Sequence, residues 1–324
     1  MKMKKMIALA LACATVTASF SGCGKKKDDV YEIGICQLVQ HVALDAATEG
    51  FQDALTEKLG DKVQFDVKNA AGDAPTCGVI VNQFVSDKKD LIMANATASL
   101  QSAFAATAEI PIVATSITDY ATALDIDDWT GKTGVNVTGT CDLAPLDQQA
   151  AMIKELFPDA KKVGILYCSA EANSKYQAVK IAEHLSALGI ATEEFTCSDS
   201  NDVAMVTSAA CAASDVIYIP TDNMMASSTG IVDGVAGPAG VPIVAGEAGI
   251  CKGCGVATLS IDYYSIGYAA GLQAYEILEN GADPAEMEID YATELTKQYV
   301  ADRCAKFKIT VPDDYEAMVI EDGE

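Results

Sequence analysis

Hydroxyl and carboxylate side chains recur just after short apolar runs along this 324-residue chain. Thr97 and Ser99 follow one such run, and Ser116, Thr118 and Asp119 follow the next. Hydroxyl groups at the start of a helix, together with its unpaired backbone N–H groups and its dipole, favour an anion such as a carboxylate. The first two residues are therefore a candidate anion site, to which the hydroxyls of the second group can add donors.

Carboxylates further along the chain can supply the opposite charge. Asp119, Asp222 and Glu247 each follow an apolar run and can neutralise an ammonium group. An anion site beside an ammonium site is the pattern that an amino-acid head group requires. Local roles are the alternative, because Ser, Thr and Asp also cap helices and hold turns, and His41 is either a ligand contact or a packed loop histidine.

The elements that must position these residues alternate between strand and helix. Strands are expected at residues 32–36, 63–67, 91–94 and 112–114, and helices at residues 43–59, 77–85 and 99–108. Apolar strands that are each followed by a helix are typical of a parallel sheet buried on both faces. Ligands bind such sheets beyond the carboxyl ends of the strands, where the polar residues described above fall.

A second series of the same kind follows a turn-rich connection at residues 129–134. It predicts helices at residues 148–157, 174–188, 203–213 and 225–235, and strands at residues 163–167, 191–195, 216–219 and 243–245. We expect a later strand (255–259) and helix (264–278) to return to the first half and the C-terminal segment to rejoin the second. The predicted fold class is α/β, with two doubly wound parallel-sheet lobes joined by a multi-crossover hinge. Lobe 1 is predicted to comprise residues 31–118 and 250–281, and lobe 2 to comprise residues 119–249 and 282–324.

The N-terminus has the pattern of a bacterial export signal. Lysines precede an apolar run at residues 6–18, which is shorter than the roughly 20 residues that a membrane-spanning helix needs. Small residues and Cys23 follow, as in a lipoprotein cleavage box. We predict a signal peptide at residues 1–22, lipidation of Cys23 and a lipidated tether at residues 23–30, so that the mature chain is anchored to the membrane without crossing it. The alternative is an ordinary secretory signal in which Cys23 is incidental.

Of the 11 cysteines, nine remain when Cys13 and Cys23 of the N-terminal segment are set aside, and most of these are expected to be buried thiols. Disulfide frameworks belong to small domains with poor cores, and this chain is long enough for ample cores. Cys251 and Cys254 have the two-residue spacing of a local disulfide or of half a zinc site, but no second pair or nearby histidine completes four ligands. We therefore expect a loop with two thiols or one local disulfide there, with no metal and no cofactor.

Charge and motifs exclude two classes of function. A formal net charge of −24 repels phosphate backbones, so we expect no nucleic-acid partner. An enzyme of this size would need a nucleophile with its base or a metal cluster, and the chain has only two histidines and no Gly-x-Ser-x-Gly motif. We therefore expect a binding protein and no enzyme.

The chain resembles the tryptophan/tyrosine-type substrate-binding lipoproteins of ABC transporters, which have the type I periplasmic-binding-protein fold. The segments that carry the resemblance include GICQLVQH at residues 34–41, EANS at 171–174, YIPTDN at 218–223 and DYYSIG at 262–267. Such segments cover most of the mature chain in the family's order. Cys36, Cys168 and the Cys251–Cys254 loop depart from the family's pattern and flank the cleft, so they bear on ligand identity more than on fold.

The resemblance implies a ligand site at the sheet edges identified above. The predicted ligand-binding residues are Gln40, His41, Thr97, Ala98, Ser99, Ser116, Thr118, Asp119, Asn173, Ser174, Asp222, Asn223 and Glu247. Tyr167, Tyr218 and Tyr263 are candidates for an aromatic wall, with ordinary packing as the alternative.

The resemblance also implies a mechanism of capture by closure of the two lobes on an amino acid, most simply Trp, Tyr or Phe. An extracytoplasmic, lipid-anchored monomer would deliver this cargo to an ABC permease. The chain has no Gly-x-x-x-x-Gly-Lys-Ser/Thr loop, so the ATPase would be a separate subunit. Another small carboxylate, a nucleoside or a peptide as ligand, or a role as a sensor's ligand-binding protein, are the alternatives.

Overall fold

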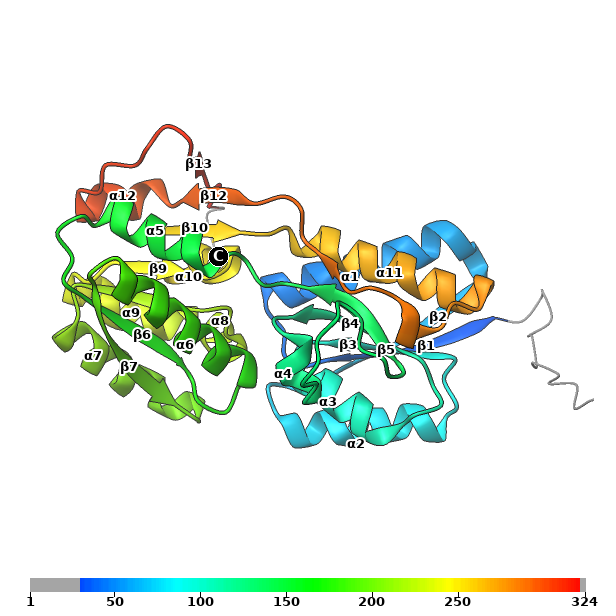
Figure 1. Ribbon diagram of the computed structural model, residues 1–324. Coiled ribbons are helices and arrows are strands. Elements are labelled where there is room, and N and C mark those ends of the chain that lie inside the picture. The colour runs from blue at the N-terminus through cyan, green and yellow to red at the C-terminus, as the bar shows by residue number, and fades with distance from the viewer. Residues whose placement is uncertain (1–29, 321–324) are drawn as a thin grey trace, which may run out of the picture.

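The central strands of the first lobe are buried on both faces, as a parallel sheet between two helical layers requires. The computed structural model describes residues 30–320 (Figure 1). Every residue of β3 (Leu91–Asn95) and β4 (Ile112–Ile117) is buried. The other elements of this lobe are β1 (Tyr31–Gln37), α1 (Val42–Leu59), β2 (Val63–Asn69), α2 (Ala74–Ser86), α3 (Thr97–Ala106), α4 (Tyr120–Leu124), β5 (Val137–Cys141), α11 (Tyr263–Asn280) and β11 (Asp290–Tyr291).

The first sheet has six strands in the order β11-β5-β4-β3-β1-β2, and neighbouring strands are parallel. Its strands therefore all end at one edge, which faces the second lobe (Figure 1). The turns after β1, β3 and β4 lie at that edge, and these turns carry the polar residues singled out from the sequence.

The second lobe repeats the arrangement around a seven-stranded sheet in the order β13-β12-β10-β9-β8-β6-β7. All neighbouring strands are parallel except β10 and β12, which pair antiparallel. Its elements are α5 (Leu146–Leu156), β6 (Lys162–Cys168), α6 (Ala172–Ala187), β7 (Ala191–Cys197), α7 (Val203–Ala213), β8 (Val216–Ile219), α8 (Asn223–Ser227), α9 (Thr229–Ala239), β9 (Ile243–Ala245), α10 (Ala248–Cys254), β10 (Ala257–Ser260), β12 (Thr296–Tyr299), α12 (Ala301–Phe307) and β13 (Glu316–Ala317).

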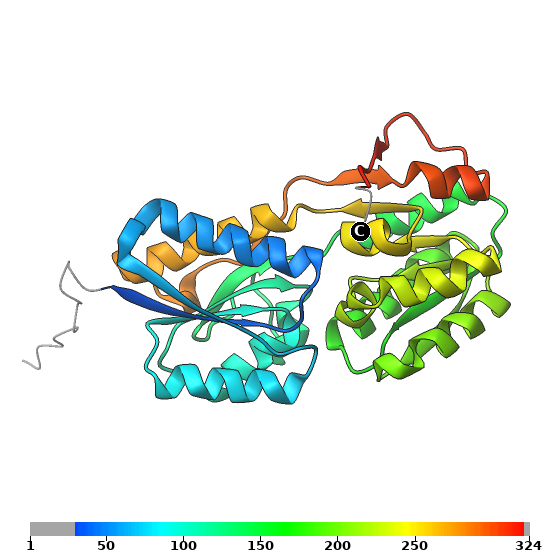
Figure 2. The same ribbon diagram turned by 180° about the vertical axis from the view of Figure 1, so that it is seen from behind.

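Three crossings join the lobes. The chain passes from β5 to α5 through residues 142–145, returns from β10 to α11 through residues 261–262, and leaves again from β11 to β12 through residues 292–295. The three segments run close together between the lobes in both views (Figures 1 and 2). A hinge built from three short connections allows one lobe to rotate against the other while each keeps its own core.

The predicted lobe boundaries need correction. Residues 119–141 were assigned to lobe 2, but β5 pairs with β4 and belongs to the first sheet. Residues 250–260 were assigned to lobe 1, but β10 pairs with β9 and belongs to the second. Residues 290–291 also return to the first sheet, where β11 pairs with β5. The order of strands along the chain does not reveal which lobe each strand belongs to, because a connection between the lobes and a loop within one lobe have similar lengths.

The first lobe is closed on one face by α1 and α11, which lie side by side (Figure 2). Their contact is close because small residues meet there: a Cβ atom added to Gly267 would lie 2.0 Å from the carbonyl oxygen of Ala47. Buried side chains of these two helices, such as Phe51 of α1, pack against one face of the first sheet, where they meet Ile33 of β1. Residues 263–280 thus complete a core that begins at residue 31.

Two smaller expectations also differ from the structure. The region of Cys251 and Cys254 is helix α10 and no loop, and both sulfurs are free, buried thiols. The helix expected at residues 225–235 is two helices, α8 and α9, which meet at Ser228. The predicted signal peptide, Cys23 and most of the tether lie outside the described residues.

Candidate functional site

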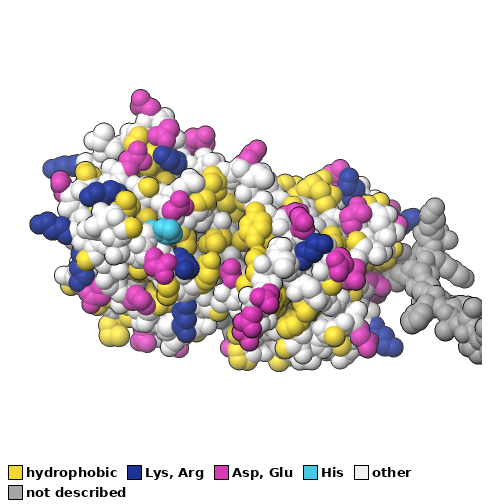
Figure 3. All heavy atoms as spheres, viewed as in Figure 1, with side chains coloured by type: hydrophobic (Ala, Val, Ile, Leu, Met, Phe, Trp, Pro, Cys, Tyr) yellow, Lys and Arg dark blue, Asp and Glu magenta, His cyan; other side chains and the backbone are white. Residues whose placement is uncertain are grey.

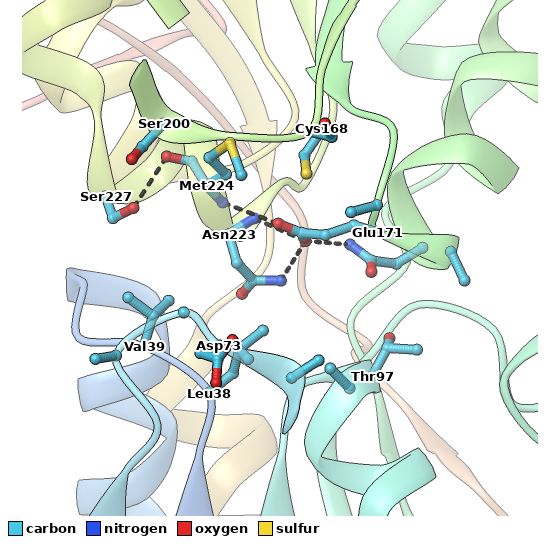
Figure 4. A pocket seen from close by; sticks show the side chains of 18 of the residues that line it. Leu38, Val39, Asp73, Thr97, Cys168, Glu171, Ser200, Asn223, Met224 and Ser227 are labelled. Atoms are coloured by element: carbon cyan, nitrogen blue, oxygen red, sulfur yellow. Dashed lines mark hydrogen bonds between the residues drawn. The ribbon is translucent and has the colours of Figure 1, made fainter. Parts of the chain in front are cut away.

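A cavity of about 410 Å³ lies between the lobes, at the facing edges of the two sheets (Figure 4). Its apolar lining comes from both lobes, with Leu38, Val39 and Pro75 on one side and Cys168 and Met224 on the other. Thr97 and Ala98 at the start of α3 also line it, as do Asp73, Gln101, Glu171, Asn173, Ser198, Ser200, Asn223 and Ser227. The cavity therefore has apolar surface in both lobes and polar groups at several points.

A much smaller chamber of about 10 Å³ adjoins this cavity, and the two share Asn173 and Asn223 as lining residues. That volume is about what one water-sized group occupies. The other residues that line the chamber are His41, Leu44, Ser116, Thr118, Asp142, Thr221, Asp222, Ala226, Glu247 and Tyr263. Three of these are acids and none is a lysine or arginine, so the chamber suits a small cationic group.

Burial makes the three acids of the chamber weaker than usual. It raises the pKa of Asp142 to about 6, although hydrogen bonds from Tyr263 and Thr118 act in the opposite direction. It raises the pKa of Glu247 to about 7 in the same way. Removing a carboxylate from water disfavours its charged form, and a nearby cation restores it. A cation that enters the chamber is therefore expected to ionise acids that are partly protonated without it.

Asp222 also has a structural role. Its carboxylate accepts hydrogen bonds from the backbone N–H groups of Cys168, at 2.6 Å, and Met225, at 2.8 Å. Burial raises its pKa to about 7, and the neighbouring Glu171 carboxylate adds to the rise. Asp222 thus caps α8, ties it to the end of β6, and still lines the chamber.

Glu171 holds the start of α8 from the other side. Its carboxylate accepts the backbone N–H of Met224, at 2.9 Å, and both the backbone N–H and the side-chain amide of Asn223, the latter at 2.6 Å (Figure 4). Asn173 donates a fourth hydrogen bond at 3.2 Å. With these four donors in place, the Glu171 carboxylate is a support for its neighbours.

Hydrogen bonds cross the cleft at two points. His41 Nε2 lies 3.2 Å from Asn223 Oδ1, which joins the N-terminus of α1 to that of α8. Gln177 Nε2 on α6 lies 3.5 Å from Thr118 Oγ1 after β4. Both pairs require the lobes to be close together, so this structure has the lobes closed on the cleft.

Two cleft residues have unusual backbone conformations. Ala96, between β3 and α3, has φ 87° and ψ 157°, and Ser116 has φ 58° beside an irregularity in the pairing of β4 with β5. Residues other than glycine avoid these regions, at a cost of about 1–3 kcal/mol each. Ser116 Oγ is also buried and has no hydrogen-bond partner within residues 30–320. Strain and an unsatisfied hydroxyl at the same position are features of binding sites.

The structure brings most of the predicted residues to the two cavities. Those that line one or both of them are His41, Thr97, Ala98, Ser116, Thr118, Asn173, Asp222, Asn223 and Glu247. Their convergence follows from the parallel sheets, because residues after successive strands meet at one edge. Their contact with a ligand stays a prediction.

The other four predicted residues lie outside both cavities. Gln40 is exposed, and Asp119 caps α4 by accepting the backbone N–H of Thr122 at 2.7 Å. Ser99 is buried between the thiols of Cys36 and Cys77, at 3.6 and 3.5 Å, because it lies on the face of α3 that packs on the lobe. Ser174 is fully buried and hydrogen-bonds the Asp222 carboxylate from behind. Asp119 thus has a local role of the kind considered as an alternative, and Ser99 and Ser174 pack inside the lobes.

Several cavity residues were not predicted. Asp142 escaped because β5, the strand before it, was not recognised. Leu38, Val39 and Met224 escaped because apolar residues after strands give no signal that separates a ligand wall from a core. Glu171 stood in a segment that carries the family resemblance and could have been found there.

The three tyrosines considered for an aromatic wall have other surroundings. Tyr263 lines the small chamber and donates to Asp142 at 2.9 Å. Tyr218 is fully buried and donates to Gln149, and Tyr167 donates to Glu194. Among residues 30–320, no aromatic side chain lines the larger cavity.

Within residues 30–320, no three His, Cys, Asp or Glu side chains are grouped so that they could hold a metal ion. In the same part of the chain, none of the helices combines the length and the apolar character needed to span a membrane.

On the face shown in Figure 3, acidic and basic side chains are scattered over both lobes.

Comparison with known proteins gives a consistent family. The family model described as ABC transporter substrate binding protein matches residues 32–318. A protein of Clostridioides difficile (strain R20291) named tyrosine-binding protein is 38% identical over 294 residues, which are 86% of this chain and 85% of that protein.

Solved structures agree and report on the arrangement of the lobes. A Streptococcus pneumonia protein, described as an ABC domain in complex with L-Trp, is 29% identical with a TM-score of 0.86, over 90% of this chain and all of that one. A substrate-binding protein with adhesive properties from Clostridium difficile, solved in a ligand-free, open form, is 35% identical over the same share of both chains, but its TM-score is only 0.68. The less similar sequence thus has the more similar shape, as expected if this chain has the closed arrangement.

A leucine-binding protein of Thermotoga maritima has the same fold at 16% identity, with a TM-score of 0.60 over 78% of this chain and 83% of that one. The predicted fold class, two parallel-sheet lobes of the type I periplasmic-binding-protein kind, is confirmed. Since the family model matches nearly all of the described residues and a curated relative is more than one third identical over most of its length, this chain belongs to the family of ABC transporter substrate-binding proteins.

Proposed function

We propose that this protein captures an aromatic amino acid, tyrosine or tryptophan, in the cleft between its lobes and releases it to an ABC permease without changing it chemically. The observation that carries this proposal is the pair of adjoining cavities. One holds about a single polar group among three acids, and the other is much larger and has apolar surface from both lobes. An α-amino acid with a bulky side chain has the same two parts.

The ammonium group fits the small chamber on grounds of charge and size. Asp142, Asp222 and Glu247 supply negative charge there, and Ser116 offers an unpaired hydroxyl. The α-carboxylate fits the start of α3, where Thr97 and Ala98 line the larger cavity and Ala96 provides no capping side chain. Backbone N–H groups in the first turn of a helix have no partner within the helix and attract anions.

The side chain would then occupy the larger cavity. An aromatic ring that buries about 200 Å² gains on the order of 5 kcal/mol from leaving water, before ordering costs. Leu38, Val39 and Met224 supply the apolar contacts, and a thioether beside a ring adds a favourable contact. The relatives that are named for tyrosine binding or were solved with L-Trp support an aromatic ligand.

The remaining parts of the proposal concern the protein's place in the cell. We propose that it acts outside the cytoplasm as a monomer, anchored by a lipid on Cys23, beside a permease whose ATPase is a separate subunit. The family supports the transporter partnership, and the export pattern of the first 23 residues supports the anchor.

The test is calorimetric titration of the mature, unlipidated protein after unfolding and refolding to remove retained ligand. The panel is L-tyrosine, L-tryptophan and L-phenylalanine, with L-leucine, adenosine and a dipeptide as other classes. Two tyrosine analogues examine the head group: tyramine lacks the carboxylate, and 3-(4-hydroxyphenyl)propionate lacks the ammonium.

We expect an aromatic amino acid to bind most tightly and each analogue to bind at least tenfold more weakly, because each leaves one polar site unpaired. Preference for L-leucine would keep the mechanism and refute the aromatic ligand. Binding of adenosine or the dipeptide alone would refute the head-group assignment.

A further inference from the structure

His41 has two ring nitrogens in different situations. Nε2 lies 3.2 Å from Asn223 Oδ1 across the cleft. Nδ1 is buried and has no hydrogen-bond partner within residues 30–320. A buried nitrogen without a partner costs free energy, so native structures usually provide one.

The neighbours of His41 determine which nitrogen carries the proton. The Glu171 carboxylate can only accept hydrogen bonds, so the Asn223 side-chain group 2.6 Å from it must be the donating NH₂. The Asn223 oxygen therefore faces His41, 3.2 Å from Nε2. Figure 4 shows the other half of this arrangement, the Asn223 amide nitrogen turned toward Glu171 and the oxygen turned away from it. Because that oxygen only accepts, His41 Nε2 must carry the hydrogen.

Burial also favours the neutral form of the ring. Burial lowers the pKa of His41, although the hydrogen bond with Asn223 and the charge of Asp45 act in the opposite direction. A neutral imidazole has one N–H and one lone pair. With the hydrogen on Nε2, the lone pair is on Nδ1, which makes the unpartnered nitrogen an acceptor.

A hydrogen-bond acceptor at His41 suits the small chamber, which is acidic. His41 lines the small chamber together with Ser116, whose hydroxyl is the chamber's other unpartnered polar group, and with the acids Asp142, Asp222 and Glu247. Carboxylates attract any cation. A lone pair on a rigid ring, by contrast, accepts a hydrogen bond along a fixed direction, and an ammonium group has N–H groups to donate.

We propose that His41 Nδ1 accepts a hydrogen bond from the ligand's ammonium group and is a specificity-determining contact of this protein. Glu171 is a positioning residue, because it orients the Asn223 amide and thereby sets the tautomer of His41. The chain Glu171–Asn223–His41 also joins the lobes, so the contact is complete only in the closed form. The part of this inference that concerns the ligand rests on the proposed function.

The tautomer can be measured directly by ¹⁵N NMR on histidine-labelled mature protein. The chain has two histidines, and His184→Asn identifies the His41 signals. We expect a neutral ring at pH 7 with the proton on Nε2. On addition of L-tyrosine, the Nδ1 signal is expected to move in the direction of a hydrogen-bonded acceptor, whereas 3-(4-hydroxyphenyl)propionate should leave it in place.

Glu171→Gln tests the positioning role, because it replaces the acceptor-only carboxylate by an amide of the same shape. We expect this variant to have a mixture of His41 tautomers and to bind L-tyrosine about tenfold more weakly. If the variant does not fold, the Nδ1 shift of the wild type still decides. A proton on Nδ1 in the wild type, or the same Nδ1 shift with both compounds, would overturn the inference.

A matched pair of substitutions gives a second measure. The amide oxygen of His41→Asn can reach the position of Nδ1, and the amide of His41→Gln can reach that of Nε2. We expect His41→Asn to keep more affinity for L-tyrosine than His41→Gln, and the reverse order would contradict the assignment. If the wild type binds no aromatic amino acid, the proposed function fails. The spectra of the ligand-free protein then still test the tautomer assignment. A proton on His41 Nε2 in the wild type that is lost from Nε2 in Asn223→Ala supports the assignment. Identical His41 spectra in the wild type and Asn223→Ala overturn it.

Discussion

Ser116 illustrates how one residue in the cleft can be costly for the fold and useful for binding. Its φ of 58° is unfavourable for a residue with a Cβ atom, and its buried hydroxyl has no partner among the described residues. Removing the hydroxyl therefore breaks no hydrogen bond within that part of the protein. Any effect of its loss on ligand binding reports on the ligand itself.

We predict that Ser116→Ala weakens binding of L-tyrosine by about three- to tenfold, the effect of one ordinary hydrogen bond, and leaves the melting temperature nearly unchanged. Ser214→Ala is the matched control, because Ser214 Oγ is also buried without a partner but lines neither cavity. Titration calorimetry and thermal unfolding measure the two effects. Equal affinities for Ser116→Ala and the wild type would exclude this hydroxyl from the site.

The acids of the chamber make a prediction about pH. Burial raises the pKa of Asp142 to about 6 in the folded protein, so between about pH 4 and 6 the folded state binds a proton that the unfolded state has lost. Its contribution is therefore most favourable at low pH and is lost as the pH rises through 6. A shift of about two units corresponds to roughly 3 kcal/mol.

We predict that Asp142→Asn raises the free energy of unfolding of the ligand-free protein at pH 8 but has a smaller effect at pH 4.5, and that it weakens binding of L-tyrosine. Urea unfolding at the two pH values measures this. The exposed Asp147→Asn serves as the control. An identical pH dependence in Asp142→Asn and the wild type would show that Asp142 is not the titrating group.

At the level of single residues, the sequence predicted polar groups at the ends of strands but could not distinguish a ligand contact from a helix cap. Thr97 lines the cavity, whereas Ser99, two residues later, faces Cys36 and Cys77. The difference is the direction in which each side chain leaves α3, and this depends on how the helix packs.

Among the elements, α3 begins in an unusual way. Ala96 precedes it with φ 87° and ψ 157°, a conformation that is almost confined to glycine. The turn brings the first residues of the helix to the larger cavity, so the strain accompanies the proposed carboxylate site.

We predict that Ala96→Gly stabilises the protein by about 1 kcal/mol, because relief of strain exceeds the added freedom of the unfolded chain. This corresponds to a rise of a few degrees in melting temperature. Ala105→Gly, at an exposed position in the same helix, is expected to destabilise by a similar amount. A fall in melting temperature for both variants would refute the strain at Ala96.

The sequence predicted most strands and helices, but it missed β5 and assigned β10 to the wrong sheet. β5 is rich in threonine and contains Gly139, so it lacks the apolar run that marked the other strands. Thr138 and Thr140 are buried because they find partners in Gln273 and Thr115. Those partners lie far away in the sequence, so the pattern of neighbouring residues cannot predict them.

In the whole molecule, the closed arrangement is held in part by the bond between His41 and Asn223. A ligand that contacts both lobes shifts the population toward this form by as much as it binds the closed form better. We predict that L-tyrosine lowers the radius of gyration measured by small-angle X-ray scattering.

Asn223→Ala should need a higher concentration of L-tyrosine for the same change, because it removes the contact across the cleft. Asn201→Ala, an exposed change in the second lobe, should behave like the wild type. A radius that does not respond to saturating L-tyrosine would mean that closure does not accompany binding.

The three crossings also affect the order in which the two lobes can fold as the chain is synthesised or exported. The chain up to Cys141 does not complete the first lobe. The core of this lobe also needs α11, and its sheet also needs β11, which ends at Tyr291. A polypeptide is synthesised from its N-terminus. Any process that handles the chain from that end, such as synthesis or passage through a pore, therefore meets a first lobe that stays incomplete until Tyr291 has arrived.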